Sequence, residues 1–363
     1  EARTFGMDPL FRQLGIYAHS GQLYDPVDSD QFLYYKEAKN GQILEEGINE
    51  AGAVSSFIAA GMSYSTHGTH MIPFYIYYSM FGFQRVWDFI WAAGDMRVRG
   101  FLLGGTAGRT TLNGEGLQHQ DGHSHLAAAA TPNIKAYDLA YAYEIAFIIQ
   151  EGMREMVEEN EDVIYYLTLE NQNYTHPPMK KQFQTGIKKG VYKLIDNESS
   201  SVELFGSGPL LSETIEASIL LKKDWGIESS VWSVTSYSEL RKEAEDVDRW
   251  NRSHPDKENK QSFIQETLQD ITNPIVAVSD YMKLVSEQIR PFISNIYLTL
   301  GTDGFGRSET RESLRKFFEV DRFYIVFASI QSLVENKRVE RKVLNEVMKK
   351  YNIDPEKPNP AKI

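Results

Sequence analysis

The sequence contains no cysteine, which excludes disulfides, cysteine-ligated zinc and thiolate catalysis. It also lacks a run of about 18 apolar residues, the length that a membrane-spanning helix needs. The richest apolar stretch, residues 71–90, is interrupted by Pro73, Gln84, Arg85 and Asp88. Positive charge is scarce, since 38 Lys and Arg stand against 50 Asp and Glu, for a net charge of −12. We therefore expect no nucleic-acid partner, no membrane partner and a cytoplasmic location.

The 363 residues are long enough for two domains. Short apolar runs that predict strands alternate with amphipathic segments that predict helices, an order typical of parallel sheets in α/β domains. In the first half, strands are predicted at 71–78, 101–103 and 163–169, and helices at 42–61 and 136–157. In the second half, strands are predicted at 202–205, 230–233, 275–279, 297–300 and 323–326, and helices at 210–224, 281–290 and 338–351. The charged stretch 180–200 separates the two series and gives domains over residues 1–185 and 196–363.

A polar, glycine-containing loop follows the second predicted strand. Its residues that can bind protons or metals are Glu115, His119, Asp121, His123 and His125. His-x-His and His-x3-His spacings can ligate zinc, but no regular helix presents these ligands, and the glycines suit an active-site loop better. A catalytic role and a purely structural role both stay open, and both are favoured over a metal site.

Three glutamates lie at the start of the helix predicted over residues 42–61. Glu45 and Glu46 are ordinary first-turn carboxylates that stabilise the helix dipole. Glu50 follows Ile48 on an apolar, small-residue face, so partial desolvation should favour the protonated form that a proton relay needs. From the residues alone, a relay and plain helix stabilisation both stay open.

Aromatic residues concentrate after Pro73. They are Phe74, Tyr75, Tyr77, Tyr78, Phe81 and Phe83. Most should pack in the core, although two or three could form a wall for a flat heterocycle. A glycine-rich turn at 301–308 superficially resembles a phosphate loop, but it lacks GK[ST] and predicts a structural role.

Several long segments together resemble one known family. They are EARTFGM, GQILEEGINE, MIPFYIYYSMFGFQR, GRTTLNGEGLQH, DGHSH, AYAYE, SVTSYSEL, DYMKL and GTDGFGRSETRE. In this order they resemble the C-terminal part of the homodimeric bacterial-type pyruvate dehydrogenase first component, a transketolase-like thiamine-diphosphate enzyme. The resemblance implies an α/β pyrimidine-binding domain, whose parallel sheet is incomplete at its N-terminus, followed by a smaller α/β C-terminal domain.

The resemblance also implies roles for single residues. Glu50 matches the glutamate that contacts N1′ of the cofactor's aminopyrimidine and so promotes deprotonation of the thiazolium. Phe81 matches the aromatic residue that packs on that ring, and Ile48 matches the apolar support of the bent cofactor. His119 and Tyr78 resemble residues that face the substrate and take part in catalysis.

Glu115, Arg85 and His123 are expected at the substrate pocket, with Glu115 either in its wall or at the dimer interface. The implied cofactors are thiamine diphosphate and Mg²⁺, but the sequence has no GDG motif, the family's magnesium anchor. Mg²⁺ is therefore expected on a diphosphate-binding domain outside this chain, supplied by the second subunit of a homodimer. The other implied partners are pyruvate and the lipoyl group of dihydrolipoyl acetyltransferase, which accepts the acetyl unit.

Two alternatives to pyruvate dehydrogenase (acetyl-transferring) activity stay open. One is another transketolase-like enzyme, acting on a different 2-oxo acid or on a sugar phosphate. A sugar phosphate would need several basic residues, and only Arg85 and Arg109 are nearby. The other is a non-catalytic assembly module left after loss of the diphosphate-binding domain. We further expect the isolated chain to be inactive and residues 20–36 to form a mobile loop at the mouth of the site.

Overall fold

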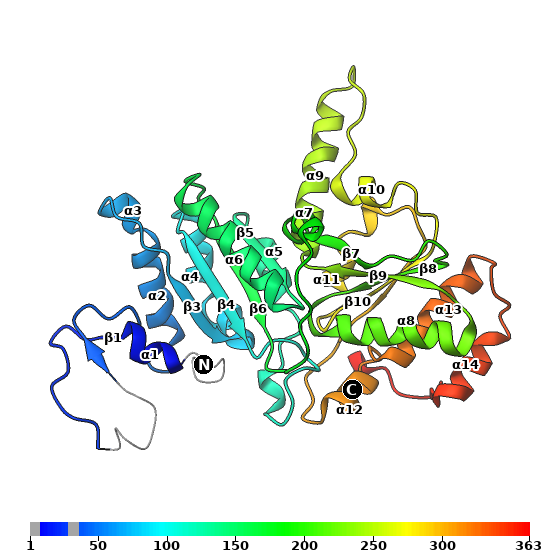
Figure 1. Ribbon diagram of the computed structural model, residues 1–363, viewed down its shortest axis with the longest axis horizontal. Helices are drawn as coiled ribbons and strands as arrows, with labels where there is room; N and C mark the ends of the chain where they lie inside the picture. Colours follow the sequence, from blue (N-terminus) through cyan, green and yellow to red (C-terminus); the bar gives the residue numbers. More distant parts are fainter. Residues whose placement is uncertain (1–7, 28–35) are drawn as a thin grey trace.

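A computed structural model describes residues 8–27 and 36–363 of the chain (Figure 1). Two α/β units lie side by side, and each is built on its own sheet. The segment EARTFGM and residues 28–35, which are eight of the 17 residues of the expected mobile loop, lie outside the described residues.

The first unit contains a sheet of four parallel strands in the order β3-β4-β6-β5. Its strands are β3 (Phe74–Tyr78), β4 (Gly100–Gly105), β5 (Ile134–Asp138) and β6 (Ile164–Leu169). The central strand β4 is buried throughout, as expected for a parallel strand covered on both faces. The expected strands at 101–103 and 163–169 are confirmed. The one expected at 71–78 forms only over Phe74–Tyr78, as an edge strand in which Tyr77 alone is buried.

Helices cover both faces of this first sheet. They are α2 (Glu50–Gly61), α4 (Ser79–Asp95) and α5 (Ser124–Ala130) on one face, and α6 (Ala142–Val157) with α7 (Gln184–Lys189) on the other. The helix expected over 136–157 is wrong in its first residues. Residues 136–138 belong to β5, because Ile134, Ala136 and Tyr137 are buried beside β6, and α6 begins only at Ala142.

The expected helix over 42–61 is also too long at its start. Gly47 has a φ of +64°, which the right-handed helix cannot accommodate. The Asn49 side chain then accepts a hydrogen bond from the Gly52 N–H at 3.1 Å and caps α2. Glu45, Glu46 and Ile48 therefore precede the helix, and Ile48 is 93% exposed.

The second unit contains a five-stranded sheet in the order β11-β10-β8-β9-β7. Its strands are β7 (Val191–Ile195), β8 (Val202–Gly206), β9 (Ser229–Val234), β10 (Ile275–Val278) and β11 (Tyr297–Leu300). The four strands expected at 202–205, 230–233, 275–279 and 297–300 are confirmed. Strand β7 was not expected; it pairs antiparallel with β9 at the sheet edge.

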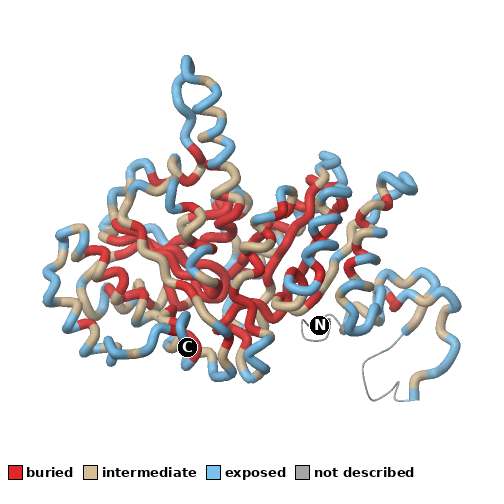
Figure 2. The backbone as a smooth tube through the Cα atoms, turned by 180° about the vertical axis from the view of Figure 1, so that it is seen from behind, coloured by how far each residue is buried: buried red, intermediate tan, exposed pale blue. Residues whose placement is uncertain are grey.

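Helices α8 (Leu211–Trp225), α13 (Arg322–Glu335) and α14 (Val343–Tyr351) pack on one face of the second sheet, and α9 (Tyr237–Ser253) with α10 (Phe263–Leu268) on the other. The strand expected at 323–326 is wrong, because these residues form the first turns of α13. Asp321 caps this helix by accepting from the Phe323 and Tyr324 N–H groups. The tip of α9 projects from the body of the molecule (Figures 1 and 2).

The helix expected over 281–290 is confined to two short pieces, α11 (Leu284–Glu287) and η4 (Arg290–Phe292). Helix α12 (Arg311–Phe317) precedes α13. The shorter elements are α1 (Asp8–Leu14), β1 (Ile16–Tyr17), β2 (Glu37–Ala38), α3 (Ser63–Thr66), η1 (Leu117–His119), η2 (Lys181–Phe183), η3 (Gly208–Leu210), α11 (Leu284–Glu287), η4 (Arg290–Phe292) and η5 (Pro360–Lys362). None of the helices in the described ranges has the length and apolar character needed to cross a lipid bilayer.

Buried polar groups join the two units. Asp138, at the end of β5, accepts a hydrogen bond from the Ser207 hydroxyl at 2.5 Å. Glu144, at the start of α6, is completely buried and accepts from the Tyr192 hydroxyl at 2.7 Å and the Ser233 hydroxyl at 2.9 Å. In Figure 2, buried residues run through both units and meet between them.

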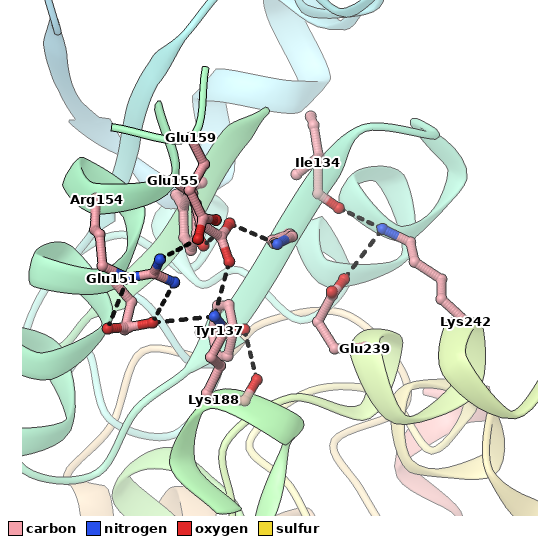
Figure 3. A network of polar contacts seen from close by, with 11 residues as sticks. Ile134, Tyr137, Glu151, Arg154, Glu155, Glu159, Lys188, Glu239 and Lys242 are labelled. Atoms are coloured by element: carbon pink, nitrogen blue, oxygen red, sulfur yellow. Dashed lines mark hydrogen bonds and ion pairs between the residues drawn. The ribbon is translucent and has the colours of Figure 1, made fainter. Parts of the chain in front are cut away.

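Charged side chains make further contacts, both within the first unit and between the two units (Figure 3). The Lys188 amine of α7 lies 3.0 Å from carboxylate oxygens of both Glu151 and Glu155 on α6. On the opposite side of β5, the Lys242 amine of α9 donates to the Ile134 carbonyl. Helix α9 of the second unit therefore contacts β5 of the first unit.

Candidate functional site

The candidate site lies at the carboxyl edge of the first sheet, where β3 and β4 end. Because the strands are parallel, the residues that follow them meet at one edge, the usual location of ligand sites in such sheets. Strand β3 leads directly into α4, with Tyr78 as the N-cap residue, and Phe81 and Arg85 on the first two turns. Strand β4 leads into the polar loop that contains η1 and His119. Helix α2 contributes its first residue, Glu50.

One side chain connects the two helices of the site. The Arg85 guanidinium donates to a carboxylate oxygen of Glu50 at 2.6 Å. The same guanidinium lies 4.2 Å from the centre of the Phe81 ring. The Arg85 side chain is 51% exposed and that of Glu50 is 19% exposed. A flat, hydrogen-bond-donating group thus contacts both the carboxylate and the aromatic ring at the mouth of the site.

The setting expected for Glu50, on the apolar face within a helix, is wrong. Glu50 is the first residue of α2, and it forms an ion pair with Arg85. The reason is that the turn at Gly47 and the Asn49 cap start the helix later than the hydrophobic spacing indicates.

His119 lies against two aromatic residues of the α4 N-terminus. Its ring centre is 5.4 Å from that of Tyr78 and 5.0 Å from that of Phe81, both in edge-to-face geometry. Within the described structure, the His119 Nδ1 atom is buried and has no hydrogen-bond partner, and the nearest carboxylate oxygen, on Glu115, is 4.0 Å away. A buried ring nitrogen without a partner can exchange a hydrogen bond or a proton with a ligand.

The other two histidines of the loop differ from His119. His123 is partly exposed, and its Nε2 lies 2.8 Å from the Gln84 amide nitrogen on α4. His125 is buried, with Nε2 at 3.2 Å from the Thr168 hydroxyl, and burial lowers its pKa. His125 therefore packs in the core behind the site, whereas His123 lies at its rim.

The structure brings most of the expected site residues together. Those in one cluster are Glu50, Tyr78, Phe81, Arg85, Glu115 and His119. Ile48 precedes α2 and has no place in this cluster, because its side chain is almost fully exposed. In the described part of the chain, no group of three or more His, Asp or Glu side chains is arranged to hold a metal ion.

Arg109, the second basic residue considered for the pocket, does not face it. It is 6% exposed and donates to the Thr302 carbonyl at 2.9 Å and to the Gly304 carbonyl. Burial lowers its pKa. Arg109 thus joins the polar loop to the second unit and packs against Gly122, where a Cβ would collide with the guanidinium.

The support beneath the cluster was not predicted from the sequence. Asp121 is completely buried and accepts hydrogen bonds from the hydroxyls of Ser79 and Ser124. Its other oxygen accepts from the backbone N–H groups of His123 and Ser124 at 2.9 and 3.0 Å. The Asp-x-x-Ser spacing could have indicated the local part of this network, but not the contact with Ser79.

Solved structures with the same fold are transketolases. The structure described as transketolase from Leishmania mexicana matches with a TM-score of 0.66 at 16% identity, over 92% of this chain and 45% of that chain. A structure described as a split gene transketolase, inactive β4 tetramer, matches with a TM-score of 0.58 at 13% identity, over 92% of this chain and 97% of that chain. At these identities the likeness shows the fold alone.

The sequence matches are more specific. The family described as the pyruvate dehydrogenase E1 component middle domain matches residues 1–177, and the transketolase-like TK C-terminal domain matches residues 190–321. Proteins named pyruvate dehydrogenase E1 component are 58% identical in Pseudomonas aeruginosa and 52% identical in Escherichia coli K12, each over 99% of this chain. The chain spans 41% of the length of these relatives. It therefore belongs to the pyruvate dehydrogenase E1 component family, and its fold is that of the transketolase-like enzymes.

Proposed function

We propose that this chain contributes the pyrimidine-binding half of a thiamine-diphosphate site in a pyruvate dehydrogenase. The complete enzyme would decarboxylate pyruvate oxidatively and transfer the acetyl unit to the lipoyl group of dihydrolipoyl acetyltransferase. The observation that carries the proposal is the contact of one flat group, the Arg85 guanidinium, with both Glu50 and Phe81.

The residues present fit an aminopyrimidine. Such a ring needs a carboxylate in its plane, to share a proton with a ring nitrogen, and an aromatic surface on which to stack. Glu50 and Phe81 supply these two groups within reach of a single planar ligand, as their common contact with Arg85 indicates. When bound, the cofactor supplies a nucleophilic carbon and an electron sink for the decarboxylation of a 2-oxo acid.

The chain's own residues would perform distinct tasks. Glu50 would hold the shared proton at N1′ of the aminopyrimidine, and Phe81 would fix the plane of that ring. His119 would exchange a proton or hydrogen bond with the substrate through its unpartnered Nδ1, and Tyr78 would keep the His119 ring in place through their edge-to-face contact. Glu115 and His123, beside His119 and Gln84, would line the pocket.

The diphosphate and Mg²⁺ are assigned to a domain outside this chain, since the sequence contains no GDG motif. We place that domain on the second subunit of a homodimer, in the cytoplasm. Within this chain, residues 1–185 would be the pyrimidine-binding domain and residues 196–363 the C-terminal domain.

The alternative substrates are less well supported. A sugar phosphate needs free cationic groups, but Arg109 is buried against backbone carbonyls and Arg85 pairs with Glu50. Another short 2-oxo acid and a non-catalytic assembly role are outcomes that the experiment below separates.

The test is Glu50→Ala in the full-length protein that contains this chain, assayed with thiamine diphosphate, Mg²⁺ and either pyruvate or another short 2-oxo acid. We expect turnover to fall at least ~100-fold, the scale of a positioned proton transfer. Glu46→Ala is the matched control, because Glu46 is a neighbouring glutamate that accepts its hydrogen bond from the Ser56 hydroxyl. Near wild-type turnover in the Glu50 variant would refute its role. A wild-type protein that decarboxylates no 2-oxo acid would support the assembly role instead.

A further inference from the structure

Asp121 connects the two segments that carry the aromatic part of the site. Ser79, which donates to it, is the first residue of α4 and directly follows Tyr78. The backbone donors, His123 and Ser124, stand at the start of α5, and His119 lies two residues before Asp121 on the same loop. One carboxylate therefore joins the loop of His119 to the helix of Tyr78.

The connection is made by charge-assisted hydrogen bonds in a buried place. Burial disfavours the ionised carboxyl of Asp121, but hydrogen bonds from Ser124, Ser79 and the His123 N–H outweigh this effect and lower its pKa. Hydrogen bonds to an ionised acceptor are roughly twice as strong as neutral ones. The uncharged Tyr166 hydroxyl also links the two serines, because it donates to the Ser124 hydroxyl at 2.8 Å and lies 3.1 Å from the Ser79 hydroxyl.

The loop has little freedom to relax around this carboxylate. Gly122 packs against the buried Arg109 guanidinium. On its other side, the Met282 N–H donates to the Gly122 carbonyl at 2.8 Å. Because Gly122 is held on both sides, a change at Asp121 would be taken up by the turn that precedes it. That turn carries His119, so His119 would shift relative to α4.

We propose that Asp121 is a positioning residue, which sets the place of His119 against Tyr78 and Phe81 through its hydrogen bond from Ser79. This inference rests on the proposed function, since it assigns Asp121 to the support of the same site. Asp121 itself touches neither substrate nor cofactor. Its effect on turnover must then pass through His119.

The test is a double-mutant cycle in the full-length protein. Asp121→Asn keeps the shape of the side chain but removes its charge, and a small displacement of His119 should lower kcat about 10- to 100-fold. In the His119→Ala background, the same substitution should change kcat less than about twofold, because coupled sites are not additive. Additive losses, or wild-type kcat in the Asp121 variant, would overturn the proposal.

Glu144→Gln is the matched control for Asp121→Asn. Glu144 is also completely buried and also has two backbone N–H donors and two hydroxyl donors, but none of them belongs to the site. Any loss of kcat in this control should combine additively with His119→Ala. A control that couples to His119 as strongly as Asp121→Asn does would show general destabilisation and overturn the proposal.

A second pair of variants covers the case in which Asp121→Asn fails to fold. Ser79→Ala removes only the donor on α4, and Ser207→Ala, its control, removes a buried hydroxyl that donates to Asp138 away from the site. Ser79→Ala should lower kcat in the wild-type background and not in His119→Ala, whereas Ser207→Ala should show no such coupling. Equal behaviour of the two serine variants would overturn the proposal.

Hydrogen exchange gives a readout that does not depend on turnover. In Asp121→Asn, the His123 and Ser124 amides should exchange faster, because they lose a charged acceptor. Unchanged exchange in a folded Asp121→Asn variant would contradict the anchoring role. An inactive wild-type protein would instead point to failure of the proposed function, and the exchange result would still stand.

Discussion

Arg85→Ala tests whether the Arg85 guanidinium occupies the place of the aminopyrimidine. In the structure this group donates to Glu50 at 2.6 Å and lies 4.2 Å from the centre of the Phe81 ring. A ligand that uses both Glu50 and Phe81 has to displace it first. Removing the arginine should therefore strengthen cofactor binding, although Arg85 was expected at the substrate pocket.

The size of the effect follows from exposure. Since the Arg85 side chain is 51% exposed, its ion pair with Glu50 contributes about 0.2–1 kcal/mol. Its contact with the Phe81 ring adds about 0.5–1 kcal/mol at an exposed position. The displacement cost is then about 0.7–2 kcal/mol. Because 1.4 kcal/mol corresponds to a factor of ten, Arg85→Ala should tighten binding about 3- to 30-fold.

Calorimetric titration of the full-length protein with thiamine diphosphate, at saturating Mg²⁺, measures this change. Arg97→Ala is the control, because Arg97 is an exposed arginine of the same unit, paired with Asp162 at 3.5 Å. Its affinity for the cofactor should equal that of the wild type. Unchanged or weaker binding in Arg85→Ala would refute displacement. A raised KM for pyruvate with unchanged cofactor affinity would instead place Arg85 on the substrate.

Three further predictions concern other parts of the molecule. Metal analysis of the purified chain should find no stoichiometric zinc, and one tightly held zinc per chain that is lost in His119→Ala would contradict the non-metal role of His119. The chain alone should bind thiamine diphosphate with a Kd of about a millimolar or weaker. The reason is that one stacked ring and one hydrogen bond barely offset an association cost of about 4–15 kcal/mol. Micromolar binding would place the diphosphate site within this chain. Burial disfavours ionisation of Glu155, but hydrogen bonds from Lys135 and Tyr165 prevail and lower its pKa to about 2. The ionised Glu155 carboxylate therefore stabilises the fold fully above its ordinary pKa of 4.5, and this stabilisation is lost as the pH falls toward 2. The urea concentration at the midpoint of unfolding should be lower for Glu155→Gln than for the wild type at pH 7. The two midpoints should converge as the pH falls below 4.5.

Strand positions were predictable where short apolar runs were bounded by glycine, proline or polar residues. Errors arose where a run of four apolar residues suits either a strand or a helix, as at 323–326. At residues 323–326 the Asp321 cap favours a helix, and so do the buried positions, which continue at helical spacing to Leu333. The position of helix α9 was not predicted, because its surface is charged and few of its residues are buried.

The site residues could be named from motifs, but their partners could not. Arg85 is 35 residues from Glu50, and Asp121 is 42 residues from Ser79. Such pairs depend on how strands β3 and β4 are placed in the sheet, which no local pattern encodes. The start of α2 was missed for a local reason, since the turn at Gly47 and the Asn49 cap override the apolar spacing.

The buried carboxylate of Glu144 has a consequence for the exchange of one unit by recombination. Two of its four donors belong to its own unit, at Ala140 and Tyr141, and two belong to the other unit, at Tyr192 and Ser233. A recombination event that exchanged one unit for an unrelated partner would leave a buried carboxylate short of donors, at a cost of about 1–3 kcal/mol for each one lost. That loss is a large share of the 5–15 kcal/mol by which domains are typically stable. Replacing one unit without the other would therefore cost stability at this contact.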